Sequence, residues 1–160
     1  MKHISQKSID QAISIIDNLE DDKLEQVFEK YALKQETLLA YLMMAPTEYE
    51  NEKLEGILIY YFCLISECFH QEGVNINEIK ESQIEDHLDP YVEMLDDYFE
   101  YEEEEILESY LDQPHLYQFL KNEVSTEDDD GTRFDEDTAN QLFIVTISMV
   151  ALMKNAISEH

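Results

Sequence analysis

The chain has 160 residues, 44% of them hydrophobic, and carries a formal net charge of −28. That length fits one core of reasonable size, and the apolar content excludes a disordered acidic chain. With only 3 Gly and 3 Pro, there is little turn chemistry for a many-stranded β fold. We therefore expect an all-α fold in which residues 1–160 form a single compact domain of about six or seven helices around a buried central helix.

The negative charge belongs mainly to one part of the chain. Residues 75–137 contain 23 acidic and 3 basic residues, and no Lys or Arg lies between Lys80 and Lys121. Such a surface repels nucleic acid and anionic membranes, so neither is an expected partner. The longest apolar run, 142–153, is shorter than the about 20 residues of a membrane span, and the start of the chain has no signal-peptide core. We expect a cytoplasmic protein.

The first 45 residues are typical of helices with short breaks. Apolar positions between Ile9 and Leu19 recur at helical spacing, and so do those between Leu24 and Tyr31. The second of these helices, or another after a small break, continues to Ala45, where Pro46 is expected to stop it.

The next helix is predicted to be the central one. Thr47-Glu48-Tyr49-Glu50 has the spacing of a capping box, and the helix that it opens should end near Gln71, before Gly73. This helix is apolar on all sides between Ile57 and Ile65, which indicates cover by neighbouring helices. Cys63 and Cys68 lie about 140° apart around its axis, so we expect buried free thiols and no disulfide.

Two start signals follow in the second half of the chain. Asn77 can cap a short helix, and Asp89-Pro90 is typical of a new helix that runs to about Leu111. Asp135 or Asp137 is expected to start a last, largely buried helix. The resulting regions are an acidic helical region at about 77–124, an acidic loop at 125–137 and the buried C-terminal helix at about 138–157.

The stretch DDYFEYEEEEILESY, residues 96–110, has no cation at all. On a helical wheel, Val92, Leu95 and Phe99 share an apolar stripe with Ile106 and Tyr110, flanked by Tyr91 and Tyr98. The carboxylates cluster on the opposite side. We take these acidic residues as the candidate partner-binding site: Glu93, Asp96, Asp97, Glu100, Glu103, Glu104 and Glu108.

Two details of this stretch favour a function over a merely solvated face. Carboxylates four residues apart recur at Glu93/Asp97, Asp96/Glu100, Glu100/Glu104 and Glu104/Glu108, and each such pair costs a helix about 0.2–0.5 kcal/mol. No neighbouring cation in the sequence relieves them. Glu102 also falls inside the apolar stripe, so either the helix breaks near Tyr101 or this glutamate is partly buried.

In composition, this acidic helical pattern resembles the anti-restriction DNA mimics of phages and the immunity proteins of bacteriocins and toxins. The resemblance implies an inhibitor that meets a basic surface of another protein. The alternative is a structural helical domain whose acidity serves solubility.

Other candidate sites have weaker patterns. In the loop 127–137, Asp128, Asp130 and Gly131 fit a calcium loop, but Asp137 stands where the bidentate glutamate belongs. Glu67 and His70 have the Glu-x-x-His spacing of bundle di-iron sites without a second copy. No nucleophile motif or phosphate-binding glycine loop occurs. We therefore expect no catalytic residues, no metal and no cofactor, and weak divalent-cation binding by this loop stays an alternative.

Overall fold

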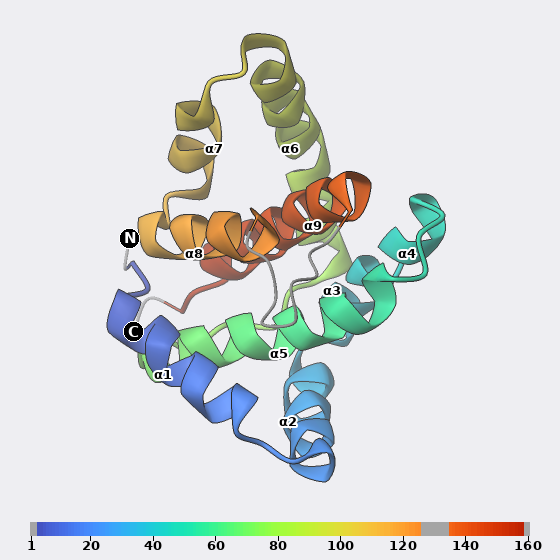
Figure 1. Cartoon of the computed structure of the whole chain (residues 1–160). Coiled ribbons are helices and arrows are strands. Elements are labelled where there is room, and N and C mark those ends of the chain that lie inside the picture. Colours follow the sequence, from blue (N-terminus) through green and yellow to red (C-terminus); the bar gives the residue numbers. More distant parts are fainter. Residues whose placement is uncertain (1–2, 126–134, 159–160) are drawn as a thin grey trace.

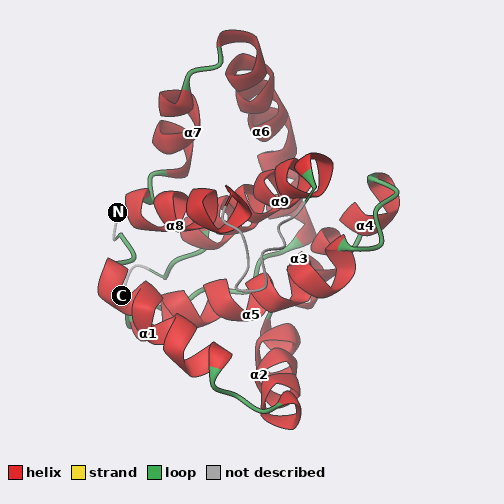
Figure 2. Cartoon of the chain, viewed as in Figure 1, coloured by secondary structure: helices red, strands yellow, loops and turns green. Residues whose placement is uncertain are grey.

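The computed structural model describes residues 3–125 and 135–158, which form helices joined by short loops (Figures 1 and 2). The all-α prediction is confirmed, with more helical segments than expected. In chain order they are α1 (Gln6–Asp17), α2 (Asp21–Lys34), α3 (Glu36–Leu42), α4 (Ala45–Glu48), α5 (Leu54–Gln71), α6 (Glu81–Tyr101), α7 (Glu104–Leu111), α8 (Pro114–Ser125) and α9 (Glu136–Asn155).

Helices α5 and α9 lie at the centre of the fold (Figure 1). Helix α5 packs against α1, α2 and α4 as well as α9, while α9 also contacts α6, α7 and α8. Every residue of 61–69 in α5 and of 145–153 in α9 is buried. The prediction of two buried central helices is confirmed, and it follows from side chains that are apolar all round the axis.

Several predicted helix ends are confirmed. The Asp135 carboxylate accepts a hydrogen bond from the Thr138 backbone N–H at 2.7 Å and caps α9. The Thr138 side chain, this backbone bond and the nearby Lys53 ammonium hold the pKa of Asp135 well below its usual range. Gly73 follows α5 at φ 79°, a left-handed conformation that glycine adopts without strain.

A break at Gln35 separates α2 from α3, which decides between the one-helix and two-helix alternatives for this region. The Gln35 side chain is buried, and it satisfies two backbone groups of the segment before α6. Its Nε2 donates to the Asn77 carbonyl at 3.0 Å, and its Oε1 accepts from the Ile79 N–H at 2.9 Å. The helix is therefore interrupted at Gln35, whose buried side chain connects this region to the distant segment before α6 through hydrogen bonds.

The predictions around Pro46 and Thr47 were wrong. Pro46 does not end a helix but lies in the first turn of α4, where its missing N–H has no intrahelical partner to lose. Thr47 lies inside α4, so it does not cap α5. The chain leaves α4 through Glu50, which has φ 52°, and α5 begins only at Leu54.

The predicted restart at Asp89-Pro90 was also wrong, because α6 runs without interruption through Pro90. Its N-cap is Lys80, not Asn77, and the Lys80 N–H donates to the Gln83 side chain at 2.8 Å. A proline inside a helix costs about 3 kcal/mol. Here one buried row crosses the proline and holds both halves in register: Ile84, His87, Tyr91 and Met94.

Helix α6 ends at Tyr101, and Glu102 has left-handed backbone angles of φ 53° and ψ 32°. The Glu102 N–H donates to the Tyr98 carbonyl at 2.8 Å, and its side chain is exposed. Of the two predicted alternatives, the helix break is confirmed and the buried glutamate is excluded. After the break the chain turns back, so that α6 and α7 form a helical hairpin (Figure 1).

Replacing Glu102 by glycine should raise the free energy of unfolding by about 1 kcal/mol, because left-handed angles cost an L-residue about 1–2 kcal/mol. Glu93→Gly removes the same side chain within α6 and should instead lower it by about 0.5–1 kcal/mol. Urea unfolding followed by helical ellipticity measures both. A loss of stability in Glu102→Gly would contradict a strained left-handed turn at this residue.

Candidate protein-binding face

The predicted binding residues lie on the α6–α7 hairpin. Glu93, Asp96, Asp97 and Glu100 project from the C-terminal half of α6, Glu103 follows the break, and Glu104 and Glu108 belong to α7. All are exposed except Glu104, which is half-buried. We call these seven residues the acidic face. Because α6 and α7 have different axes, the seven do not form one continuous row, and the predicted Glu100/Glu104 pair does not lie within one helix.

The prediction that no cation relieves these carboxylates was wrong for Glu104. The Lys121 ammonium of α8 forms an ion pair with Glu104 Oε1, and the Tyr117 hydroxyl donates to the same oxygen at 2.8 Å. Lys121 and Tyr117 together lower the pKa of the Glu104 carboxyl. In residues 3–125 and 135–158, Glu104 is the one member of the acidic face with an ion pair.

Contrary to the prediction from the sequence, the apolar residues of α6 are not all buried. Val92 is 52% exposed and Phe99 58% exposed, although both were expected in the core. Leu88 is also exposed and Leu95 is half-buried. We call Leu88, Val92, Leu95 and Phe99 the apolar stripe. At 100° per residue it lies about 90° from the buried row of α6, and the acidic residues of α6 lie about 100° further round.

A groove of about 190 Å³ opens beside the apolar stripe. Leu95, Tyr98 and Phe99 of α6 form one wall, and Phe143 and Ile144 of α9 form the opposite wall. Leu107 of α7 also lines it. The walls are mostly apolar, with Asn140 the one amide side chain. We call this the α6–α9 groove, and it places an apolar depression next to the acidic face.

A buried polar network fixes α6 to its neighbours beneath this groove. His87 Nε2 lies 2.8 Å from Ser148 Oγ, and the Tyr41 hydroxyl lies 3.2 Å from the same oxygen. The Tyr110 hydroxyl is 3.3 Å from His87 Nδ1, and the Tyr91 ring stacks on the imidazole at 4.9 Å. Burial lowers the pKa of His87 to about 4, so the ring is neutral at pH 7.

The sequence gives no warning of this network, because its members come from α3, α6, α7 and α9. Ser148 lies in the apolar run of α9, and the hydrogen-bond partners of His87 lie on other helices, whereas its stacking partner Tyr91 is four residues further along α6. Ser148 and His87 are both buried. The serine–histidine contact joins α6 to α9 and so helps to order the helix that carries most of the acidic face.

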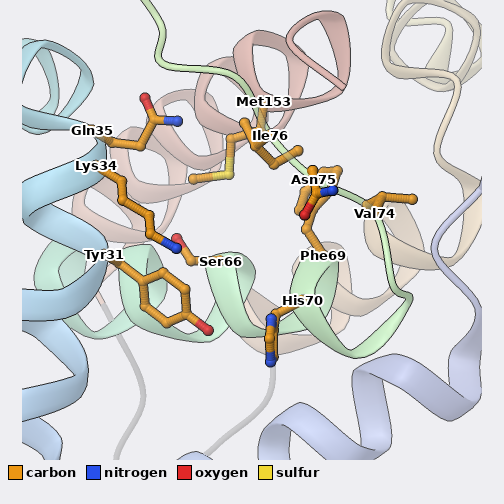
Figure 3. A pocket seen from close by; sticks show the side chains of 10 residues that line it. All are labelled: Tyr31, Lys34, Gln35, Ser66, Phe69, His70, Val74, Asn75, Ile76 and Met153. Atoms are coloured by element: carbon orange, nitrogen blue, oxygen red, sulfur yellow. The ribbon is translucent and has the colours of Figure 1, made fainter. Parts of the chain in front are cut away.

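A second depression, of about 110 Å³, lies between α2, the end of α5 and the chain that follows α5 (Figure 3). Its lining combines polar and apolar side chains: Tyr31, Lys34, Gln35, Ser66, His70 and Asn75 with Phe69, Val74, Ile76 and Met153. It has room for only a few groups the size of a water molecule.

The weak metal-binding pattern at Glu67 and His70 gains no support from the described residues. Glu67 is buried, and its two oxygens accept hydrogen bonds from the Tyr31 hydroxyl and from Gln71 Nε2, the latter at 2.8 Å. His70 is exposed, and no three His, Cys, Asp or Glu side chains within 3–125 and 135–158 converge as a metal ion requires. The calcium hypothesis concerns mainly residues 126–134, which lie outside the described part of the chain.

Cys63 and Cys68 are free and buried, as predicted. Burial raises the pKa of the Cys63 thiol to about 11 and that of Cys68 to about 12, so neither is a thiolate at neutral pH. Among the described residues, no helix combines the length and the apolar character that crossing a membrane requires.

No known protein family, curated protein or solved structure matches this chain. The acidic face, the apolar stripe and the α6–α9 groove are therefore the features from which a function can be argued.

Proposed function

We propose that the protein binds a basic surface of a partner protein through its acidic face and performs no catalysis. The observation that supports this most directly is the concentration of unneutralised charge. Six of the seven carboxylates have no ion pair within the described residues, and the nearest basic residues in the sequence are Lys80 and Lys121.

The like-charge pairs give this arrangement a cost that a solvated surface could avoid. Glu93/Asp97 and Asp96/Glu100 lie within α6 and have no ion pair among the described residues, whereas Lys121 relieves the third pair, Glu104/Glu108 of α7. Each such pair opposes its helix by about 0.2–0.5 kcal/mol, and a Lys at one position of each would turn that cost into a gain. A basic partner supplies the missing cations and is drawn to the face by long-range attraction.

The alternative function, acidity for solubility alone, depends on the amount of charge and not on its position. Two triple variants separate these ideas because each removes three carboxylates from exposed positions. Glu93→Gln, Asp97→Asn and Glu100→Gln neutralise the acidic face on α6. The matched control neutralises α2, through Asp22→Asn, Glu25→Gln and Glu29→Gln.

The probe is a fluorescent peptide of about 20 residues, rich in lysine and without large apolar side chains. At about 50 mM salt we expect the α6 triple variant to bind it at least about fivefold more weakly than the parent protein, and the α2 control to change by less than about twofold. Raising salt to about 200 mM should weaken parental binding. Fluorescence anisotropy measures the affinity. Equal weakening by the two triples would overturn the proposal and favour solubility.

A further inference from the structure

The apolar stripe is unusual among the exposed side chains of this protein. Of the eight large apolar residues that are exposed in the described part of the chain, four lie on α6: Tyr101 at its end, on another side of the helix, and Leu88, Val92 and Phe99 together on the stripe. They stand beside the most acidic surface of the molecule, where solvation alone would favour more charge. Exposed apolar residues that gather on one face in this way mark an interaction site.

The spacing of the stripe indicates the shape of its partner. Leu88, Val92, Leu95 and Phe99 are separated by four, three and four residues, which is the spacing by which a helix presents apolar side chains to another helix. The α6–α9 groove continues the stripe, since Leu95 and Phe99 belong to both. Its volume of about 190 Å³ exceeds the share of a water molecule several times over, enough for a bulky apolar side chain.

The carboxylates beside the apolar stripe indicate which charge a partner helix carries. Along α6, Glu85, Asp89 and Asp96 are exposed on the side of the stripe away from the buried row. A second copy of the chain would bring its own acidic residues against these, so self-association through this face is electrostatically opposed. A helix with Lys or Arg flanking its apolar row would instead gain attraction at the same positions.

We infer that the acidic face and the apolar stripe together receive a basic amphipathic helix of another protein, whose apolar row lies along the stripe and places one large side chain in the α6–α9 groove. This inference rests on the proposed function and makes the partner more specific. The helix packs as amphipathic target helices do in apolar grooves, with the apolar row supplying affinity and the cations supplying orientation and rate of encounter.

Two peptides of about 20 residues test the inference. Both consist of the same numbers of leucine and lysine residues. In the first, leucines follow the i, i+3, i+4, i+7 pattern of an amphipathic helix, and in the second the same residues are scrambled so that no apolar row forms. The first should bind the parent protein at least about tenfold more tightly, with a gain of peptide helicity on binding.

Variants of the protein then test whether the apolar stripe causes the preference for the amphipathic peptide. Val92→Asn with Phe99→Asn removes the two most exposed side chains of the stripe without changing charge, and valine, phenylalanine and asparagine have similar helix propensities. We expect this double variant to bind both peptides with affinities within about threefold of each other. The matched control is Leu33→Asn with Met44→Asn, which removes two exposed apolar residues elsewhere and should keep the preference.

The possible results distinguish failure of this inference from failure of the proposed function. Loss of the preference in the α6 double variant alone supports the inference. Equal binding of the two peptides by the parent protein overturns it, and so does a preference that survives in the α6 double variant. In either of these cases the proposed function still stands if the lysine-rich peptide binds the α6 triple variant more weakly than it binds the α2 control triple. Failure of that earlier experiment would remove the proposed function and this inference together.

Discussion

Replacing Tyr31 by phenylalanine should lower the free energy of unfolding by about 2–3 kcal/mol, because it leaves a buried glutamate oxygen without its hydrogen bond. The Tyr31 hydroxyl of α2 donates to Glu67 Oε2 of α5, and both residues are buried. Burial and the neighbouring Glu67 carboxylate raise the pKa of Tyr31, so the hydroxyl keeps its proton throughout the physiological range. Gln71 reaches only the other oxygen, Oε1, and cannot take over the lost bond without leaving its own.

A double variant separates the cost of an unsatisfied carboxylate from the cost of a lost contact. Tyr31→Phe combined with Glu67→Met replaces both polar groups by apolar ones of similar size, and it should recover more than half of the loss. Urea unfolding followed by helical ellipticity gives the free energies for Tyr31→Phe, for Glu67→Met and for the double variant. If the double variant were as unstable as the sum of the two single changes, the hydrogen bond would carry none of the effect.

The second large effect is a loss of stability on mild acidification through His87. Its pKa is about 4 in the folded protein against 6.5 in an unconstrained chain, so the unfolded chain binds the proton first. The stabilisation from neutral His87 is complete above pH 6.5, falls as the pH drops from 6.5 towards 4, and changes no further below that. A lowered pKa of this size corresponds to about 2 kcal/mol between pH 7 and pH 5.

The matched variant for this experiment is His87→Phe, which keeps a ring beside Tyr91 but does not titrate. Acidification also relieves repulsion among the many carboxylates, and that contribution is common to both proteins. The difference in unfolding free energy between parent and variant should therefore shrink by about 2 kcal/mol from pH 7 to pH 5. Chemical denaturation at each pH measures it. A difference that stays constant with pH would mean that the pKa of His87 is the same in the folded and the unfolded protein.

The sequence predicts those parts of the fold that depend on local or all-round apolar patterns. The central positions of α5 and α9, the Asp135 cap and the Gly73 turn are of this kind. The break at Glu102 could be anticipated for a related reason: a glutamate in phase with an apolar stripe conflicts with a continuous helix, and a left-handed residue resolves the conflict by moving it into solvent.

The errors arise where distant segments decide the local outcome. Pro90 stays within α6 because a row of buried side chains outweighs the lost backbone bond. Val92 and Phe99 are exposed because the apolar arc of α6 is wider than the surface its neighbours cover, and a helical wheel cannot tell which part of that arc is covered. Lys121 neutralises Glu104 across a helix–helix contact that their separation in the sequence conceals.

The candidate site shows the same division. Its carboxylates could be identified from composition and spacing alone, since a run of like charge is visible in any chain. The α6–α9 groove could not, because its two walls are about 45 residues apart in the sequence and only the packed structure brings them together. Nor could the network around Ser148, whose four helices meet only in the folded state.

Because Cys63 and Cys68 are buried in α5, the rate at which their thiols are modified reports how often this part of the protein unfolds. A thiol reagent added at mildly alkaline pH meets neither sulfur while α5 is covered, so modification waits for an unfolding event. When reclosing is faster than labelling, the rate follows the open population, and a destabilisation of about 1.4 kcal/mol accelerates it about tenfold. The chain has no tryptophan to provide an intrinsic fluorescence signal. The reaction rate of its two cysteine thiols can be followed in place of such a signal.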